Sequence, residues 1–151
     1  NYTAGNKRLI ASVKGWKINL QVCYDLRFPV WARQASVTDG LKEGRGGKPE
    51  YDLLIYVANW PEKRIDAWKI LLQARAIENQ CYVAGANRVG RDGNEIYHNG
   101  ESMIIDPLGA ILYHKTDDED IFTCSLQKEV LKNIREKFPF WKDADFFTIN
   151  H

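Results

Sequence analysis

The chain has 151 residues, a length typical of one domain, and 44% of them are hydrophobic, which is enough to bury a core. Its 21 basic and 20 acidic residues leave a net charge of +1, so there is no excess positive field to hold nucleic acid or an anionic membrane. Because the sequence also has no apolar run of membrane-spanning length, we expect no nucleic-acid and no membrane partner.

The positions of the cysteines and histidines bear on disulfide formation and metal binding. The three cysteines lie far apart without a CxxC pair, which favours a reduced, cytoplasmic setting over a disulfide framework: Cys23, Cys81 and Cys124. The three histidines show no metal-ligand spacing: His98, His114 and His151. We therefore expect no metal and no cofactor.

Two short strands are predicted at residues 9–13 and 17–22, joined by a turn in which Gly15 can adopt a positive φ. In the second strand polar and apolar residues alternate, and the apolar ones are Ile18, Leu20 and Val22. This period of two predicts a strand that buries its apolar face.

Cys23 stands where this second strand ends. Pro29 suits the first turn of a following helix, because its missing N–H has no helical partner there. The thiol is therefore expected in a strand-to-helix turn, where free N–H groups and the positive end of a helix dipole stabilise a thiolate and an oxyanion. The alternative is a small buried hydrophobic residue. Polar neighbours favour the mouth of a site, and they are Tyr24, Asp25 and Arg27.

Residues 39–49 hold four glycines and a proline and are predicted to be a solvated surface loop, without the context of a phosphate loop. Residues 53–58 form an apolar run typical of a strand covered on both faces. Ligands bind at the carboxyl ends of such strands, so Asn59 and Trp60 are expected on the same rim as Cys23, where Asn59 would bind an amide or carboxylate and Trp60 would wall the pocket. The alternative is a turn at Asn59 and a core-covering Trp60.

Residues 64–80 are predicted to form a helix, because apolar residues recur at spacings of three and four. On it Arg75 and Glu78 face each other, and the simplest interpretation is a surface ion pair, worth less than about 1 kcal/mol if exposed. If the helix instead packs at a subunit interface, the pair could fix the geometry of the site. Cys81 is expected to be buried and inert. Further strands are predicted at residues 81–86, 101–106, 110–114 and 120–125, with a turn at 91–94 and a terminal helix at 126–137. The tail, residues 138–151, is rich in aromatic side chains that should pack on this domain or on a second subunit.

Six short motifs are distributed in order along nearly the whole chain: Val-Cys-Tyr-Asp-Leu-Arg-Phe-Pro at 22–29, Ala-Asn-Trp-Pro at 58–61, Gln-Ala-Arg-Ala-Ile-Glu-Asn-Gln at 73–80, Gly-Ala-Asn-Arg-Val-Gly at 85–90, Ser-Met-Ile-Ile-Asp-Pro-Leu-Gly at 102–109 and Arg-Glu-Lys-Phe-Pro-Phe-Trp-Lys-Asp-Ala-Asp at 135–145. They resemble the motifs of the nitrilase superfamily, the carbon–nitrogen hydrolases, and the last one looks like the ending of the omega-amidase branch. The first resembles the nucleophile motif of the superfamily.

The resemblance implies an α/β fold, a nitrilase-type α-β-β-α sandwich with two sheets between helical layers. The superfamily uses a Glu–Lys–Cys triad whose Glu and Lys lie upstream of the Cys, and this chain supplies only the cysteine. We therefore expect residues 1–151 to be the carboxyl-terminal portion of one such domain, with the amino-terminal part absent, and to be inactive alone. A self-sufficient domain is the alternative that the length leaves open.

The resemblance also implies amide hydrolysis, in which Cys23 forms a thioester and ammonia is released. Tyr24 directly follows the nucleophile and is expected to offer its backbone N–H to the oxyanion. Omega-amidases act on 2-oxo dicarboxylic acid monoamides such as 2-oxoglutaramate, whose second carboxylate needs a cation, and the candidates are Arg27, Arg64 and Arg88.

Members of the superfamily associate through their carboxyl-terminal segments, so a homo-oligomer is expected. Two other interpretations stay open. One is hydrolysis of a nitrile or a carbamoyl amine by the same triad, and the other is a non-catalytic binding or assembly module that keeps the fold.

Overall fold

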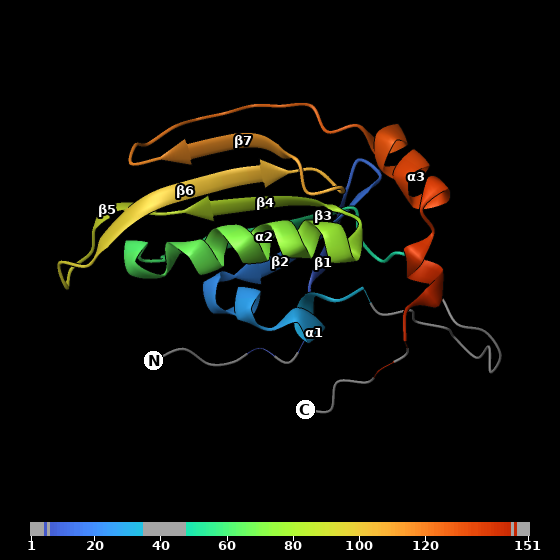
Figure 1. The fold of residues 1–151 in the computed structure, drawn as a ribbon, viewed down its shortest axis with the longest axis horizontal. Coiled ribbons are helices and arrows are strands. Elements are labelled where there is room, and N and C mark those ends of the chain that lie inside the picture. Colours follow the sequence, from blue (N-terminus) through green and yellow to red (C-terminus); the bar gives the residue numbers. More distant parts are fainter. Residues whose placement is uncertain (1–4, 6, 35–47, 146, 148–151) are drawn as a thin grey trace.

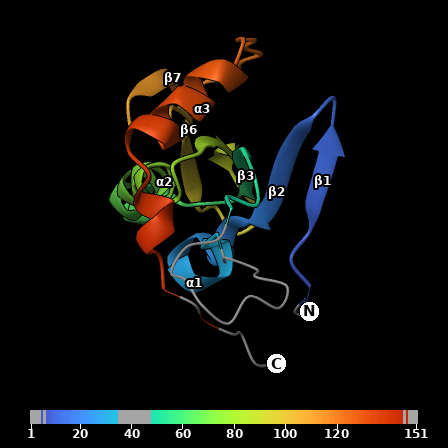
Figure 2. The same ribbon diagram turned by 90° about the vertical axis from the view of Figure 1, so that its right-hand side faces the viewer.

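The computed structural model describes residues 5, 7–34, 48–145 and 147, so most of the predicted loop at residues 39–49 lies outside the described part of the chain. The described residues form a mixed seven-stranded sheet, and a long helix, α2, lies along one of its faces (Figures 1 and 2). The predicted α/β class is thereby confirmed.

The strands follow the order β1-β2-β3-β4-β6-β5 in the sheet, and β7 pairs with β6. Their bounds are β1 Ile10–Val13, β2 Trp16–Val22, β3 Leu53–Ala58, β4 Tyr82–Asn87, β5 Val89–Arg91, β6 Tyr97–Ile105 and β7 Ile111–Thr116. The helices are α1 Pro29–Ala32, α2 Ile65–Asn79 and α3 Lys128–Lys137, with short 3-10 turns η1 Cys23–Arg27, η2 Glu62–Arg64 and η3 Phe140–Asp143. None of the described helices is long and apolar enough to cross a membrane.

Strands β2, β3 and β4 are parallel neighbours, whereas the remaining pairs are antiparallel. Their register places Val22 opposite Val57 and Ala58 opposite Asn87. The carboxyl ends of all three strands therefore lie at one edge of the sheet. Cys23 directly follows β2 at this edge, as the sequence predicts.

Helix α2 packs closely against β4. A Cβ atom at Gly85 would lie 2.5 Å from Leu72 Cδ1 and 2.8 Å from Trp68 Cζ2, so only glycine leaves room for the helix at this point. The largest buried side chains of the core are Leu26, Tyr51, Leu54, Tyr56, Trp68, Leu72, Val83 and Ile105. The core thus lies between α2, the turn η1 and one face of the sheet.

Helix α3 lies at the end of the sheet away from β5 (Figure 1), where the carboxylate of Asp52 holds it. Asp52 accepts the backbone N–H of Lys17 at 2.9 Å and pairs with Lys128 at 3.1 Å and Arg135 at 3.3 Å. Arg135 also donates to the carbonyl of Tyr51 at 2.7 Å. The predicted terminal helix is confirmed, and the residue that anchors it, Asp52, is distant from it in the sequence.

The prediction that β2 buries its apolar face is wrong for this structure. Asn19 and Gln21 are 0% and 3% exposed, whereas Leu20 and Val22 are 43% and 60% exposed. The polar residues share a face with Tyr56, because Gln21 lies opposite Tyr56 in the register, and this is the face that α2 covers. The alternation shows correctly that the two faces differ, but the covered face is the polar one.

The opposite face of the sheet is apolar and open in the described part of the chain. Residues that follow one another across it are Leu20, Ile55, Ala84 and Ile104 in one row and Val22, Val57 and Ala86 in the next. A hollow of about 740 Å³ lies over this face, bounded by Phe122 and Tyr113 on its far side. The second sheet of the expected sandwich would cover such a face, and the described residues supply one sheet only.

Two further segments differ from the sequence-based prediction. Residues 120–125 form no strand, and Phe122 instead stacks on Tyr113 with ring centroids 4.1 Å apart. In the tail, Trp141 donates to the carbonyl of Arg135 and packs on this domain, whereas Phe140 remains 66% exposed. Packing on this domain thus describes Trp141, whereas packing of the tail on a second subunit stays a prediction.

Candidate active site

Cys23 has an unusual backbone conformation. Its φ is +38°, in the left-handed region that side-chain-bearing residues rarely adopt. Such a conformation costs about 1 to 3 kcal/mol, and it persists only where the surrounding structure holds it in place. Strain of this kind gathers at functional sites, where it presents a side chain at a sharp turn. The thiol is partly exposed, in contrast to that of the fully buried Cys81.

The turn η1 is closed by its own residues. The carboxylate of Asp25 accepts the backbone N–H of Val22 at 2.9 Å, and its carbonyl accepts the N–H of Phe28 at 3.0 Å. Leu26 is fully buried and anchors the turn in the core, while Pro29 begins α1 as the sequence predicts. Tyr24 points its ring outwards against Phe28, with centroids 5.0 Å apart. The Asp25 carboxylate thus serves to close the turn through its hydrogen bond to Val22.

Arg75 of α2 reaches the same turn from the core side. Its Nη2 donates to the carbonyl of Leu26 at 2.6 Å, and its Nη1 binds Glu78 Oε1 at 2.9 Å. The side chain of Arg75 is only 3% exposed. The interpretation of Arg75 and Glu78 as an exposed ion pair is therefore wrong for Arg75.

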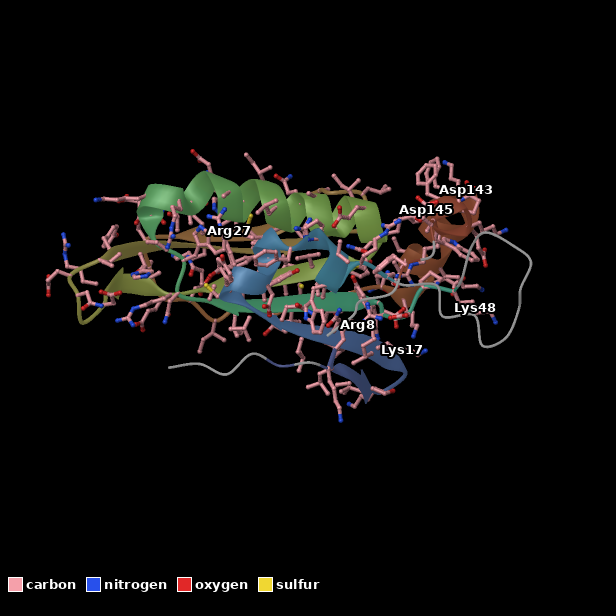
Figure 3. All side chains as sticks on the ribbon, turned by 90° about the horizontal axis from the view of Figure 1, so that it is seen from below. Arg8, Lys17, Arg27, Lys48, Asp143 and Asp145 are labelled. Carbon is pink, nitrogen blue, oxygen red and sulfur yellow. The ribbon has the colours of Figure 1, made fainter. Side chains whose placement is uncertain are left out.

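Trp60 and Arg27 lie together at the rim. Trp60 is 3% exposed, contacts Trp68 with centroids 5.7 Å apart, and donates its Nε1–H to the carbonyl of Arg64 at 2.7 Å. The guanidinium of Arg27 lies 4.7 Å from the centre of the Trp60 ring, a cation–π contact. Figure 3 shows Arg27 far from the end of the molecule that carries Lys48, Asp143 and Asp145. The buried ring thus serves as a platform for Arg27, and Asn59 beside it is exposed.

Asn87, at the end of β4, fixes the backbone of this rim. Its Oδ1 accepts the N–H of Trp60 at 2.7 Å, and its Nδ2 donates to the carbonyls of Trp60 and Gly100 at 3.0 and 2.6 Å. Its own N–H is accepted by Ser102 Oγ at 3.0 Å. Both polar atoms of the Asn87 side chain are therefore engaged in hydrogen bonds to the backbone, and Asn87 positions the segment that follows β3.

The model of the carbon-nitrogen hydrolase family matches residues 2–136, most of the chain. The chain belongs to the carbon–nitrogen hydrolases. The resemblance to the nitrilase superfamily seen in the sequence is thereby confirmed.

Relatives of this carbon–nitrogen hydrolase include omega-amidases. The omega-amidase YafV of Escherichia coli is 47% identical over 99% of this chain and 54% of its own length. The 2-oxoglutaramate amidase of Bacillus subtilis is 36% identical over 93% of this chain and 50% of its own length. A crystal structure of a CN-hydrolase superfamily protein from Xanthomonas campestris, with an arsenic adduct in its active site, is 45% identical and superposes with a TM-score of 0.91 over 99% of this chain and 54% of that one. The chain therefore spans about half the length of these relatives.

Two acidic side chains in the described part of this carbon–nitrogen hydrolase chain, Asp25 and Glu101, already have partners of their own. No glutamate precedes Cys23 in the sequence. Glu101, whose carboxylate has the right chemistry for a general base, pairs with His114 and lies 3.9 Å from Lys69. Its backbone carbonyl also accepts the indole N–H of Trp68 at 2.7 Å. Glu101 is thus held by neighbours of its own, and no group of three or more metal-ligating side chains occurs in the described ranges.

The structure brings some of the predicted residues together and leaves others to experiment. Cys23 and Tyr24 share η1, and Arg27 at its end contacts Trp60, so these four lie at one rim. The roles of Tyr24, Asn59, Trp60 and Arg27 towards a substrate stay predictions. Sequence reasoning left open that Arg75 and Glu78 fix the geometry of the site, but it missed the hydrogen bond from Arg75 to the Leu26 carbonyl. An arginine within the apolar stripe of a helix is a signal for such a buried guanidinium.

Proposed function

We propose that the protein is an amidase that uses Cys23 as its nucleophile, an omega-amidase that releases ammonia from 2-oxo dicarboxylic acid monoamides such as 2-oxoglutaramate. The observation that carries the proposal is the strained turn at Cys23, at the carboxyl edge of the parallel strands. Relatives named omega-amidase and 2-oxoglutaramate amidase support the substrate class.

The proposed reaction has two steps. In the first, Cys23 Sγ attacks the carboxamide carbon, the C–N bond breaks, and the nitrogen leaves as ammonia after it takes up a proton. In the second, water attacks the thioester, releases the carboxylic acid and returns the thiol. The backbone N–H of Tyr24 is proposed to donate to the oxyanion, because it directly follows the nucleophile in η1.

Arg27 is proposed to bind the second carboxylate of the substrate. Arg27 is exposed and its guanidinium is held over the Trp60 ring, so it can bind a ligand at the rim without the desolvation cost of a buried charge. Arg88 is the less favoured candidate, because its Nη2 donates to the carbonyl of Arg91 at 2.8 Å.

The general base, and the cation that helps to bind the oxyanion, are proposed to come from residues outside 1–151. No glutamate precedes Cys23, and Asp25 and Glu101 have partners in the structure. We therefore expect residues 1–151 alone to release no ammonia. That the chain corresponds to the carboxyl-terminal half of a larger domain, that it forms a homo-oligomer and that it works in the cytoplasm stay predictions.

Ammonia release from 2-oxoglutaramate tests the proposal, with the full-length gene product that contains these residues (the native protein) and two variants of it. The native protein should release ammonia, Cys23→Ala should lower the rate by at least about a thousandfold, and Cys124→Ala should leave it unchanged because Cys124 is exposed and outside the turn. No release by the native protein from 2-oxoglutaramate, other amides or nitriles would favour the non-catalytic module.

A further inference from the structure

The last turn of α2 holds the segment that carries Cys23 at two points. Arg75 donates to the carbonyl of Leu26 within η1 at 2.6 Å. Downstream, Asn79 Oδ1 accepts the N–H of Gln34 at 3.1 Å, and Gln34 Nε2 donates to the carbonyl of Asn79 at 2.6 Å. The chain from Leu26 to Gln34, which directly follows Cys23-Tyr24-Asp25, is therefore fixed to one helix turn at both ends.

The guanidinium of Arg75 is itself fixed. Glu78 Oε1 accepts from its Nη1 at 2.9 Å, and the side-chain amide of Asn79 bridges the Arg75 carbonyl and Glu78 Oε1 at 3.0 and 3.4 Å. The guanidinium also lies close enough to Tyr56 to oppose the rise in pKa that burial imposes on that phenol. A buried planar fork with a fixed orientation is what a rigid contact to a carbonyl requires.

Cys23 needs such a contact, because a positive φ at a residue with a side chain persists only where the surrounding structure holds it. Leu26 is three residues beyond Cys23 and fully buried, so a constraint on its carbonyl acts on the whole short turn. We propose that Arg75 is a positioning residue, which holds the nucleophile turn in its strained conformation through the Leu26 carbonyl. The benefit to catalysis rests on the proposed function, whereas the effect on the backbone does not.

A thermodynamic cycle tests the proposal without any enzymatic activity. Glycine adopts a positive φ at little cost, so Cys23→Gly should melt about 3 °C above Cys23→Ala, against the usual order of these residues. In the Arg75→Lys background this difference should fall to less than half, because a lysine ammonium cannot reach both Leu26 and Glu78 and the turn then relaxes.

The matched control is Arg135→Lys. Arg135 is also a largely buried arginine that binds backbone carbonyls, those of Gln80 and Tyr51, but it anchors α3 instead of η1. Its loss should lower both melting temperatures alike and leave the difference between Cys23→Gly and Cys23→Ala intact. If Arg75→Lys does not fold, Glu78→Gln replaces it, since a weaker partner for Nη1 should reduce the difference in the same direction.

A spectroscopic measurement on the native cysteine completes the test. Protein labelled with ¹³C at cysteine gives one Cα signal for each of Cys23, Cys81 and Cys124, and this chemical shift follows the local backbone angles. Arg75→Lys should move the Cys23 signal and leave that of Cys124 unchanged, whereas Cys81 is no reference because its thiol contacts the carbonyl of residue 75. An unchanged Cys23 signal, no advantage of glycine over alanine in the parent, or an equal advantage in the Arg75→Lys background would each overturn the proposal, and none of them depends on whether the protein hydrolyses an amide.

Discussion

At the scale of single residues, the three cysteines occupy three different environments. Cys23 lies in the strained turn and is partly exposed, Cys81 is fully buried, and Cys124 is exposed. Burial raises the pKa of the Cys81 thiol well above its usual range, so this residue stays protonated and inert in the folded state. The sequence-based expectation for Cys81 agrees with this environment.

Cys81 should make stability fall at alkaline pH. Its folded pKa is raised, so above about pH 8.5 the unfolded chain releases a proton that the folded protein retains. The free energy of unfolding should therefore decrease as pH rises, with a slope that approaches about 1.4 kcal/mol per pH unit for this group. Urea denaturation between about pH 8 and pH 9.5 measures the slope, which Cys81→Ala should reduce and Cys124→Ala should not. An unchanged slope in Cys81→Ala would contradict the assignment.

Arg27 should affect substrate binding selectively. Arg27→Met in the native protein should raise the KM for 2-oxoglutaramate by about tenfold and leave that for a monoamide without a second carboxylate nearly unchanged. Arg88→Met is the matched control, because Arg88 already donates to a backbone carbonyl. If Arg88→Met produces the selective effect and Arg27→Met does not, the carboxylate binds at Arg88.

At the scale of elements, the contact between α2 and β4 depends on one missing side chain. Gly85→Ala would place a Cβ atom 2.5 Å from Leu72 and 2.8 Å from Trp68, both large and buried. The helix must then shift, and the free energy of unfolding should drop by about 1 to 3 kcal/mol. Urea denaturation checks this value.

Gly93→Ala provides the comparison for Gly85→Ala, because no atom lies within 4 Å of a Cβ atom at Gly93. It should change the free energy of unfolding by less than about 0.5 kcal/mol. Equal effects of the two substitutions would show that α2 does not pack as closely on β4 as the structure has it.

The elements that could be predicted are those with a strong local pattern. The spacing of apolar residues gives α2 to within one residue at each end, and the strand-to-helix turn at Cys23 follows from the alternation before it and Pro29 after it. Residues 120–125 have the composition of a strand, but a strand needs a neighbouring edge, and Phe122 stacks on Tyr113 instead. The positive φ of Cys23 has no signal in residue type, because side-chain-bearing residues rarely adopt it and contacts with distant residues must hold it in place. Under our proposal the contact of Arg75 with the Leu26 carbonyl is one of them.

At the scale of the whole molecule, the sheet has one face covered by α2 and one face that no described residue covers fully. Alternation in β2 shows that its faces differ in polarity, but only the packed helix shows that Asn19 and Gln21 lie on the covered side. The open side carries the apolar residues Leu20 and Val57. An apolar surface of this kind is typical of an interface with another layer.

The open face should bind a hydrophobic dye. Residues 1–151 alone should raise the fluorescence of ANS, and Leu20→Lys and Val57→Lys should reduce it without lowering the melting temperature, since both side chains are about half exposed. A fall of several degrees in either variant would instead mean that these side chains are buried in solution.

The central claim is that Cys23 is an activated nucleophile, and its alkylation by iodoacetamide at neutral pH tests this most directly. Mass spectrometry follows Cys23, Cys81 and Cys124 in one sample, in which the exposed Cys124 serves as the reference thiol and Cys81 reports any unfolding. Cys23 should react faster than Cys124 while Cys81 stays unmodified, and 2-oxoglutaramate should slow the reaction of Cys23 in the native protein. A Cys23 that reacts no faster than Cys124, with Cys81 still protected, would contradict the account.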